Sequence, residues 1–133
     1  MDESFQEKFW ETPTNTRIVL PKKRNIKGKY INVKDYLRLT TDMPEVYVQR
    51  IFVFGGSTVF CSEVPDNFTI CSYLQREINN HHFSTRVFNY GATSVNVKQQ
   101  LERFQRDVNI QKRDIVIFYD GVNDVIQGVY HGN

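Results

Sequence analysis

The 133-residue sequence lacks three features that each mark a class of protein: a dominant charge, a long apolar run and a set of paired cysteines. Seventeen Lys and Arg residues stand against fifteen Asp and Glu residues, and the net charge of +2 argues against a nucleic-acid or membrane surface. No apolar run approaches the roughly 18 residues that cross a membrane, and the acidic start Met1–Glu11 is unlike a signal peptide. The sequence therefore shows no targeting segment and leaves the compartment unassigned.

Cysteine is scarce, since Cys61 and Cys71 are the only two. They have no second pair and no metal-type spacing, so we expect two free thiols, without a disulfide framework or a zinc site. Apolar side chains are plentiful, with 40% hydrophobic and 14% aromatic residues. This composition suits one globular domain rather than a disordered chain.

Residues 1–45 are polar and contain three of the four prolines, and we interpret them as an N-terminal arm of irregular structure. Only residues 18–20 and 30–31 suggest short strands. A basic cluster at residues 22–29 would suit an anionic partner, but no aromatic stacking pattern accompanies it. A solvated surface loop is the favoured interpretation of this cluster.

Residues 46–133 form the second region, in which apolar strands alternate with amphipathic helices. Apolar runs at 48–54, 86–90 and 114–120 predict three buried strands. Between them, apolar residues recur at steps of three and four, which predicts two helices. These residues are Phe68, Cys71, Leu74 and Ile78 in the first helix and Val97, Leu101, Phe104 and Val108 in the second. The order β-α-β-α-β predicts a three-layer α/β/α (flavodoxin-like) domain with a parallel sheet.

Each predicted strand ends in a loop that contains glycine and a polar side chain, at residues 55–58, 91–94 and 121–124. In parallel α/β sheets, ligands bind beyond the carboxyl ends of the strands. Tight turns also use glycine, but three such loops at one edge of a sheet favour a single shared site.

Ser57 lies in the first of these loops and admits three interpretations. The stretch 55–58 could cradle a phosphate on backbone amides, or Ser57 could be a nucleophile next to amides that stabilise an oxyanion. In the third interpretation, the hydroxyl of Ser57 or Thr58 only caps a helix. The motifs G-x-x-x-x-G-K-[ST] and G-x-G-x-x-G are absent, which weakens the phosphate interpretation. The nucleophile interpretation gains from Gly91 and Asn123, which offer a backbone N–H and a carboxamide N–H₂ as further oxyanion donors.

Three motifs in this order resemble the first three sequence blocks of the SGNH (GDSL-type) hydrolases: Phe54-Gly-Gly-Ser-Thr58, Asn89-Tyr-Gly91 and Asp120-Gly-Val-Asn-Asp124. The first is similar to a Gly-Gly-Ser-Thr subgroup of bacterial members, although many members have Asp where this chain has Gly56. Residues 64–75 are similar to the first helix of that subgroup. The resemblance covers about residues 48–126.

The resemblance implies a serine ester hydrolase that acts on acyl esters, such as those of saccharides, and needs no metal or organic cofactor. Its nucleophile would be Ser57. The oxyanion hole would consist of the N–H groups of Ser57 and Gly91 and the side chain of Asn123.

The last sequence block of that family, Asp-x-x-His, is absent from the chain. His81 and His82 precede the second predicted strand, so we expect them on the surface at the sheet edge opposite Ser57. His131 lies on the correct side, but it follows Asn123 by eight residues, and we do not expect it to be the base.

The resemblance also implies five parallel strands in the order 2-1-3-4-5, of which this chain supplies only 2-1-3. The third strand would remain an apolar edge, open to pairing with another chain. We therefore expect the N-terminal portion of such a domain, C-terminally truncated and nearly inactive alone. The alternatives are a non-catalytic phosphate- or nucleotide-binding domain and an inactive remnant that serves in interactions.

Overall fold

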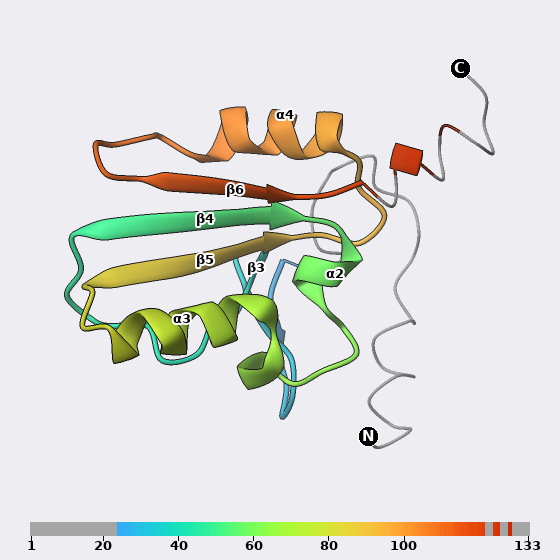
Figure 1. Ribbon diagram of the computed structural model, residues 1–133. Coiled ribbons are helices and arrows are strands. Elements are labelled where there is room, and N and C mark those ends of the chain that lie inside the picture. The colour runs from blue at the N-terminus through green and yellow to red at the C-terminus, as the bar shows by residue number, and fades with distance from the viewer. Residues whose placement is uncertain (1–23, 122–123, 126–127, 129–133) are drawn as a thin grey trace.

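The computed structural model describes residues 24–121, 124–125 and 128. Its centre is a six-stranded sheet with the strand order β1-β2-β3-β5-β4-β6 (Figure 1). Three of these strands are parallel: β4 (Gln49–Gly55), β5 (Thr85–Gly91) and β6 (Ile115–Tyr119). Because β4 lies between β5 and β6, the predicted strand order 2-1-3 is confirmed.

Helices cover both faces of the sheet, which confirms the three-layer α/β/α prediction. Helix α3 (Ile70–Asn80) lies on one face and α4 (Val97–Asp107) on the other (Figure 1). Between β4 and α3 come the short helix α2 (Ser57–Phe60) and the 3₁₀ turn η1 (Asp66–Phe68). Among the described residues, no helix is long and apolar enough to span a bilayer.

Both long helices begin at polar caps, as expected where N–H groups of a first turn need acceptors. The Thr69 side chain accepts a hydrogen bond from the Ser72 N–H. The Asn96 side chain accepts from the Gln99 N–H, and the Gln99 side chain accepts from the Asn96 N–H, which completes a capping box. The local sequence therefore fixes where α3 and α4 start.

The prediction of an irregular arm is wrong for its described part. Three short antiparallel strands extend the sheet: β1 (Ile26–Lys27), β2 (Asn32–Lys34) and β3 (Leu37–Arg38). Strand β3 joins the parallel part through the pair Arg38 and Asn89. Strands of two or three residues are too short to show a period, so hydropathy could not reveal them. Residues 18–20 lie outside the described residues.

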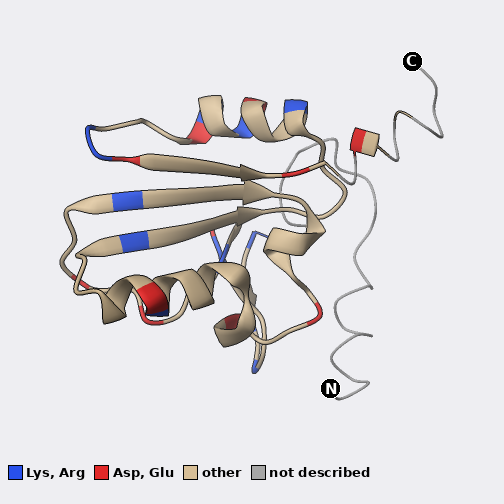
Figure 2. Ribbon diagram, viewed as in Figure 1, with Lys and Arg blue, Asp and Glu red and all other residues tan. Residues whose placement is uncertain are grey.

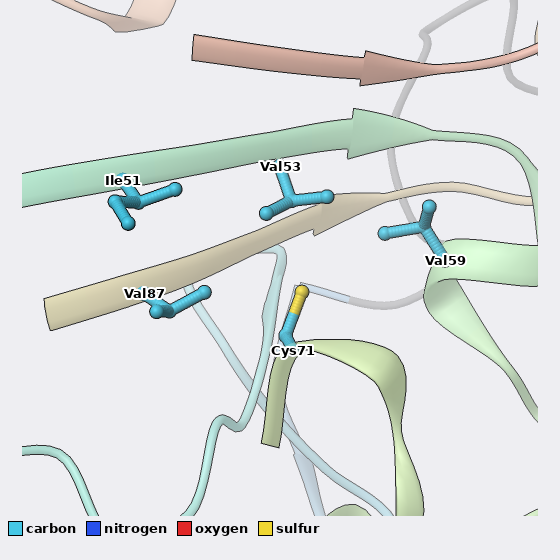
Figure 3. Packing of buried hydrophobic residues seen from close by; sticks show 5 residues of the cluster. All are labelled: Ile51, Val53, Val59, Cys71 and Val87. Atoms are coloured by element: carbon cyan, nitrogen blue, oxygen red, sulfur yellow. The ribbon is translucent and has the colours of Figure 1, made fainter. Parts of the chain in front are cut away.

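The core on the α3 side is a cluster of branched aliphatic side chains and one thiol. Figure 3 shows Ile51, Val53, Val59, Cys71 and Val87 gathered between the strands, α2 and α3. Both cysteines of the chain are free. Burial raises the pKa of the Cys71 thiol to about 12, so this thiol is a packing group rather than a reactive one.

The core on the α4 side is aromatic. Phe54 stacks on Tyr90 and on Phe118, with centroid distances of 4.7 and 5.3 Å. Phe104 of α4 meets Phe54 edge to face at 5.7 Å. These rings fix α4 against β4 and β6.

Helix α4 does not bury the whole apolar stripe that predicted it. Gln100 and Arg103 are its buried residues, and Arg103 donates to the carbonyl oxygens of Tyr90 and Tyr36 at 3.0 and 2.9 Å. By contrast, Leu101 is 43% exposed. The stripe is therefore only partly covered by the sheet: Phe104 packs on Phe54 and Phe118, while Leu101 stays exposed.

Candidate active site

The carboxyl ends of the parallel strands lie side by side. Gly55 pairs with Gly91 on one side and with Tyr119 on the other. The loops that follow β4, β5 and β6 therefore start at the same edge of the sheet (Figure 1). This confirms the prediction that the loops converge, as far as they are described.

Ser57 is the first residue of α2 and is exposed to solvent. The N–H groups of Val59 and Phe60 donate to the Gly56 carbonyl, which closes the turn. Within the described part of the chain, the N–H groups of Ser57 and Thr58 and the Ser57 hydroxyl have no hydrogen-bond partner. A serine hydroxyl and two backbone N–H groups without a partner among the described residues thus share one exposed turn.

Two glycines let α2 approach the strand ends closely. A Cβ atom at Gly55 would lie 2.2 Å from Val59 Cγ2 and 2.8 Å from the Tyr119 carbonyl oxygen. A Cβ atom at Gly91 would lie 2.3 Å from the Phe60 backbone nitrogen. Glycine is therefore required at both positions by packing, independently of any catalytic role.

Asn89 connects the two glycine-bearing loops. Its side chain is fully buried, donates through Nδ2 to the Val59 carbonyl at 3.0 Å and accepts through Oδ1 from the Gly91 N–H at 2.9 Å. The Gly91 N–H, expected to be unobstructed, is thus engaged in this conformation. Its role as an oxyanion donor stays a prediction and requires this hydrogen bond to open.

The third loop is described only in part, and Asn123 and His131 lie outside the described residues. Asp120, at the end of β6, accepts a hydrogen bond from Gln100 of α4. Asp124 accepts from the Val97 N–H at 3.2 Å. The third loop is therefore tied to the start of α4 on both sides of Asn123.

A buried arginine holds the far end of α2. Arg38 is 1% exposed and donates to the carbonyl oxygens of Phe60, Cys61 and Val64 at 2.8–2.9 Å. It also donates to Asp66 Oδ1 at 2.9 Å. Burial lowers the pKa of the guanidinium from its usual value, while the Asp66 carboxylate opposes that effect. Arg38 is thus a positively charged clamp on the segment that carries Ser57.

The electrostatic surroundings of the site are acidic. Figure 2 shows acidic residues at the end of β6 and in the short described segment after it, where Asp120 and Asp124 lie. Burial is the main cause that raises the pKa of the Asp120 carboxyl group, and the negative charge of nearby Asp124 raises this pKa further. Such surroundings suit a neutral ester better than a free phosphate.

Two of the three histidines lie far from Ser57. His81 is the C-cap of α3, and His82 follows it in the turn before β5. Both are exposed and lie at the amino ends of the parallel strands, opposite the carboxyl ends where Ser57 lies. This confirms the prediction made for them. Within residues 24–121, 124–125 and 128, no group of His, Cys, Asp or Glu side chains could hold a metal ion.

Comparison with known proteins identifies the architecture. No family model and no curated protein matches the chain. A solved structure of AlinE4, described as an SGNH-hydrolase family esterase, matches with a TM-score of 0.54 and 20% sequence identity. The match covers 64% of this chain and 46% of that chain. Two mutant forms of AlinE4 match with the same TM-score and coverage, at 20% and 18% identity.

The chain shares the fold of an SGNH-hydrolase esterase. It spans less than half the length of the AlinE4 chain. Three polar residues that hold the strand-end loops were given no role from the sequence: Arg38, Asn89 and Asp124. Asn89 and Asp124 carried a signal, because each belongs to one of the three motifs, whereas Arg38 belongs to none.

Proposed function

We propose that the chain carries the nucleophile half of a serine ester hydrolase of the SGNH type, with Ser57 as the nucleophile. The observation that supports this most directly is the exposed Ser57 turn, in which the hydroxyl and two N–H groups have no partner among the described residues. The shared fold supports the reaction class. The substrate would be an acyl ester of a small molecule or a saccharide.

In the proposed reaction, Ser57 Oγ attacks the ester carbonyl carbon and loses its proton to a general base. The carbonyl oxygen becomes an oxyanion, which the Ser57 N–H and the Asn123 carboxamide stabilise, joined by the Gly91 N–H when it leaves Asn89. The alcohol leaves with a proton, and water then hydrolyses the acyl–Ser57 bond. Both described histidines, His81 and His82, lie at the opposite ends of the strands from Ser57.

The alternative of a phosphate or nucleotide site has less support. Helix α2 has only four residues, so its dipole is weak compared with that of the long helices that usually bind phosphate. The carboxylates Asp120 and Asp124 near the same sheet edge would repel a phosphate. An inactive remnant would share this geometry but would not react at Ser57.

The test is covalent labelling with a fluorophosphonate, followed by peptide mass spectrometry, in the presence and absence of added imidazole. Imidazole supplies the missing base, so we expect it to accelerate adduct formation at Ser57 in proportion to its concentration. Ser57→Ala should abolish the adduct. Ser84→Ala is the matched control, because Ser84 is equally exposed but lies at the opposite sheet edge, before β5. Labelling that is absent, or that persists in the Ser57→Ala variant, contradicts the proposal.

A further inference from the structure

The outer edge of β6 is an apolar surface that no described element of the chain covers. Within the described part of the chain, no strand pairs with this edge. Ile115, Ile117 and Phe118 of β6 are 43%, 37% and 40% exposed. An unpaired strand with apolar side chains on both faces is a template for pairing with another chain.

Apolar groups continue on each face of the sheet beside this edge. On the α3 face, Ile115 and Ile117 stand in register with the buried residues Ile51 and Val53. On the α4 face, Phe118 meets the Phe104 ring at 6.1 Å. Leu101 lies one helical turn from Phe104 on the same stripe, and it is 43% exposed. The β6 edge, as we call this surface, thus comprises the strand, the two isoleucines and the α4 stripe.

We propose that the β6 edge pairs with the β6 edge of a second copy of this chain, strand against antiparallel strand, around a two-fold axis perpendicular to the sheet. A closed two-fold interface buries the same surface on both copies. This axis keeps both α4 helices on one face, where the Leu101 stripes meet. The isoleucines of both copies meet on the other face. One symmetric contact therefore covers every exposed part of the β6 edge.

The charges that flank β6 favour a second copy and select a register. Figure 2 shows basic residues and then an acidic residue in the turn before β6, and another acidic residue after its end. In the sequence, Lys112, Arg113 and Asp114 precede the strand and Asp120 follows it, and Asp114 is paired with Arg50 of its own chain. In an antiparallel pair, the start of one strand lies opposite the end of the other. The chain is therefore complementary to itself at this edge.

Two registers bring the apolar residues together. A pair centred on Val116 sets Lys112 opposite Asp120, twice by symmetry, and sets Ile115 opposite Ile117. A pair centred on Ile117 instead sets Asp114 opposite Asp120, which are like charges. Opposite charges across a strand pair are favourable and like charges are unfavourable. We therefore expect the register centred on Val116. In this register, Asp120 accepts a hydrogen bond from Gln100 of its own chain and pairs with Lys112 of the other copy.

The first test is sedimentation velocity of the full chain over about 1 to 500 µM, where a dimer shows itself by mass action. Ile117→Lys places a lysine opposite Ile115 on each side of the central Val116, and we expect it to raise the dissociation constant at least tenfold. Val46→Lys is the matched control, because Val46 is an apolar residue that is 81% exposed in the loop before β4. It should leave the dissociation constant unchanged. A monomer throughout, or equal effects of the two variants, overturns the proposal.

The second test reverses the charges at positions 112 and 120. Circular dichroism of each variant checks the fold, because Asp120 also accepts a hydrogen bond from the buried Gln100 side chain. Lys112→Asp and Asp120→Lys should each weaken the dimer about fivefold, because each sets like charges opposite one another. The double variant should regain most of the lost affinity. Single variants without effect, or a double variant weaker than both, overturn the register and with it the self-pairing. The self-pairing is also overturned if the purified chain forms a complex with another protein but no dimer.

Discussion

At the scale of single residues, a methyl group added at position 91 shows how tightly the Ser57 turn is packed. Its Cβ would lie 2.3 Å from the Phe60 nitrogen and 2.7 Å from the Val59 carbonyl carbon, and both are backbone atoms that cannot rotate away. We expect Gly91→Ala to lower the free energy of unfolding by about 2–4 kcal/mol, measured by urea denaturation.

The control for this substitution is Gly128→Ala. No atom of the described residues lies within 4 Å of a Cβ atom added at Gly128. Its variant should stay within about 0.5 kcal/mol of the parent. Equal stability of the Gly91→Ala variant and the parent would show that α2 does not pack on the strand ends as described.

Two Arg–Asp pairs near the N-terminal strands differ strongly in burial, which allows the contributions of a buried and an exposed ion pair to be compared. The Arg38 side chain is 0% exposed beside Asp66, whereas the Arg24 side chain is 66% exposed beside Asp35. Removing one partner of a buried pair leaves the other charge without compensation. We expect Arg38→Met to cost about 3–5 kcal/mol of unfolding free energy.

The matched variant Arg24→Met should cost no more than about 1 kcal/mol, because exposed pairs are screened by water and salt. Thermal unfolding of both variants in parallel gives the comparison. Similar losses in the two variants would contradict the clamp role of Arg38.

Sequence reasoning reached Ser57 because a hydroxyl next to two glycines, directly after an apolar strand, is a local pattern. Arg38 could not be reached in this way, and Asn89 was reached only as a motif residue without a role. Their importance arises from burial and from partners 20 or more residues distant, such as the carbonyls of Phe60 and Val59. No window of neighbouring residues contains that information.

At the scale of elements, an ion pair fastens β6 to β4. Arg50 donates to Asp114 Oδ1 and Oδ2 at 3.1 and 2.6 Å, and the Asp114 carboxylate also accepts from the Gln111 N–H. The hydrogen bond from Arg50 is the main cause that lowers the pKa of Asp114 from its usual value. The ionised carboxylate is thus the form that the fold stabilises.

The sign of the pH dependence follows from that direction. A folded-state pKa below the unfolded value means that the unfolded chain binds the proton more readily, so acid favours unfolding. We expect the parent to exceed Asp114→Asn in unfolding free energy by about 2 kcal/mol at neutral pH. The difference should shrink as the pH falls below about 4, the unfolded pKa of Asp. Urea denaturation from neutral to acidic pH measures this, and a difference independent of pH would refute the ion pair.

Elements with a clear period were predictable, and elements without one were not. Strands β4, β5 and β6 and helices α3 and α4 showed themselves as apolar runs or as steps of three and four. Strands β1 to β3 have two or three residues each and are held by pairing rather than by pattern. Periodicity also could not say which side of α4 the sheet would bury, because Gln100 and Arg103 take that place through hydrogen bonds.

At the scale of the whole molecule, we expect the absence of an Asp-x-x-His block from the sequence to limit the rate of the proposed reaction. Loss of the histidine of a serine triad lowers turnover roughly a million-fold and leaves about a thousand-fold over water. We expect the 133-residue chain to hydrolyse p-nitrophenyl acetate at a rate close to background. Ordinary turnover that Ser57→Ala abolishes would show that a base is present outside the described residues, with His131→Ala as the variant that identifies it.

The pairing of β6 with β4 has a consequence for how the chain folds. Strands β2 and β3 are joined by a two-residue turn, whereas Arg50 and Asp114 meet across 64 residues of chain. Contacts between distant residues form slowly, because the intervening loop must close first. During synthesis β4 and β5 leave the ribosome before β6. Until β6 pairs with β4, the unpaired edge strand of the nascent sheet is β4, which carries Phe52 and Phe54. During that interval the chain exposes the apolar strand that a chaperone would bind.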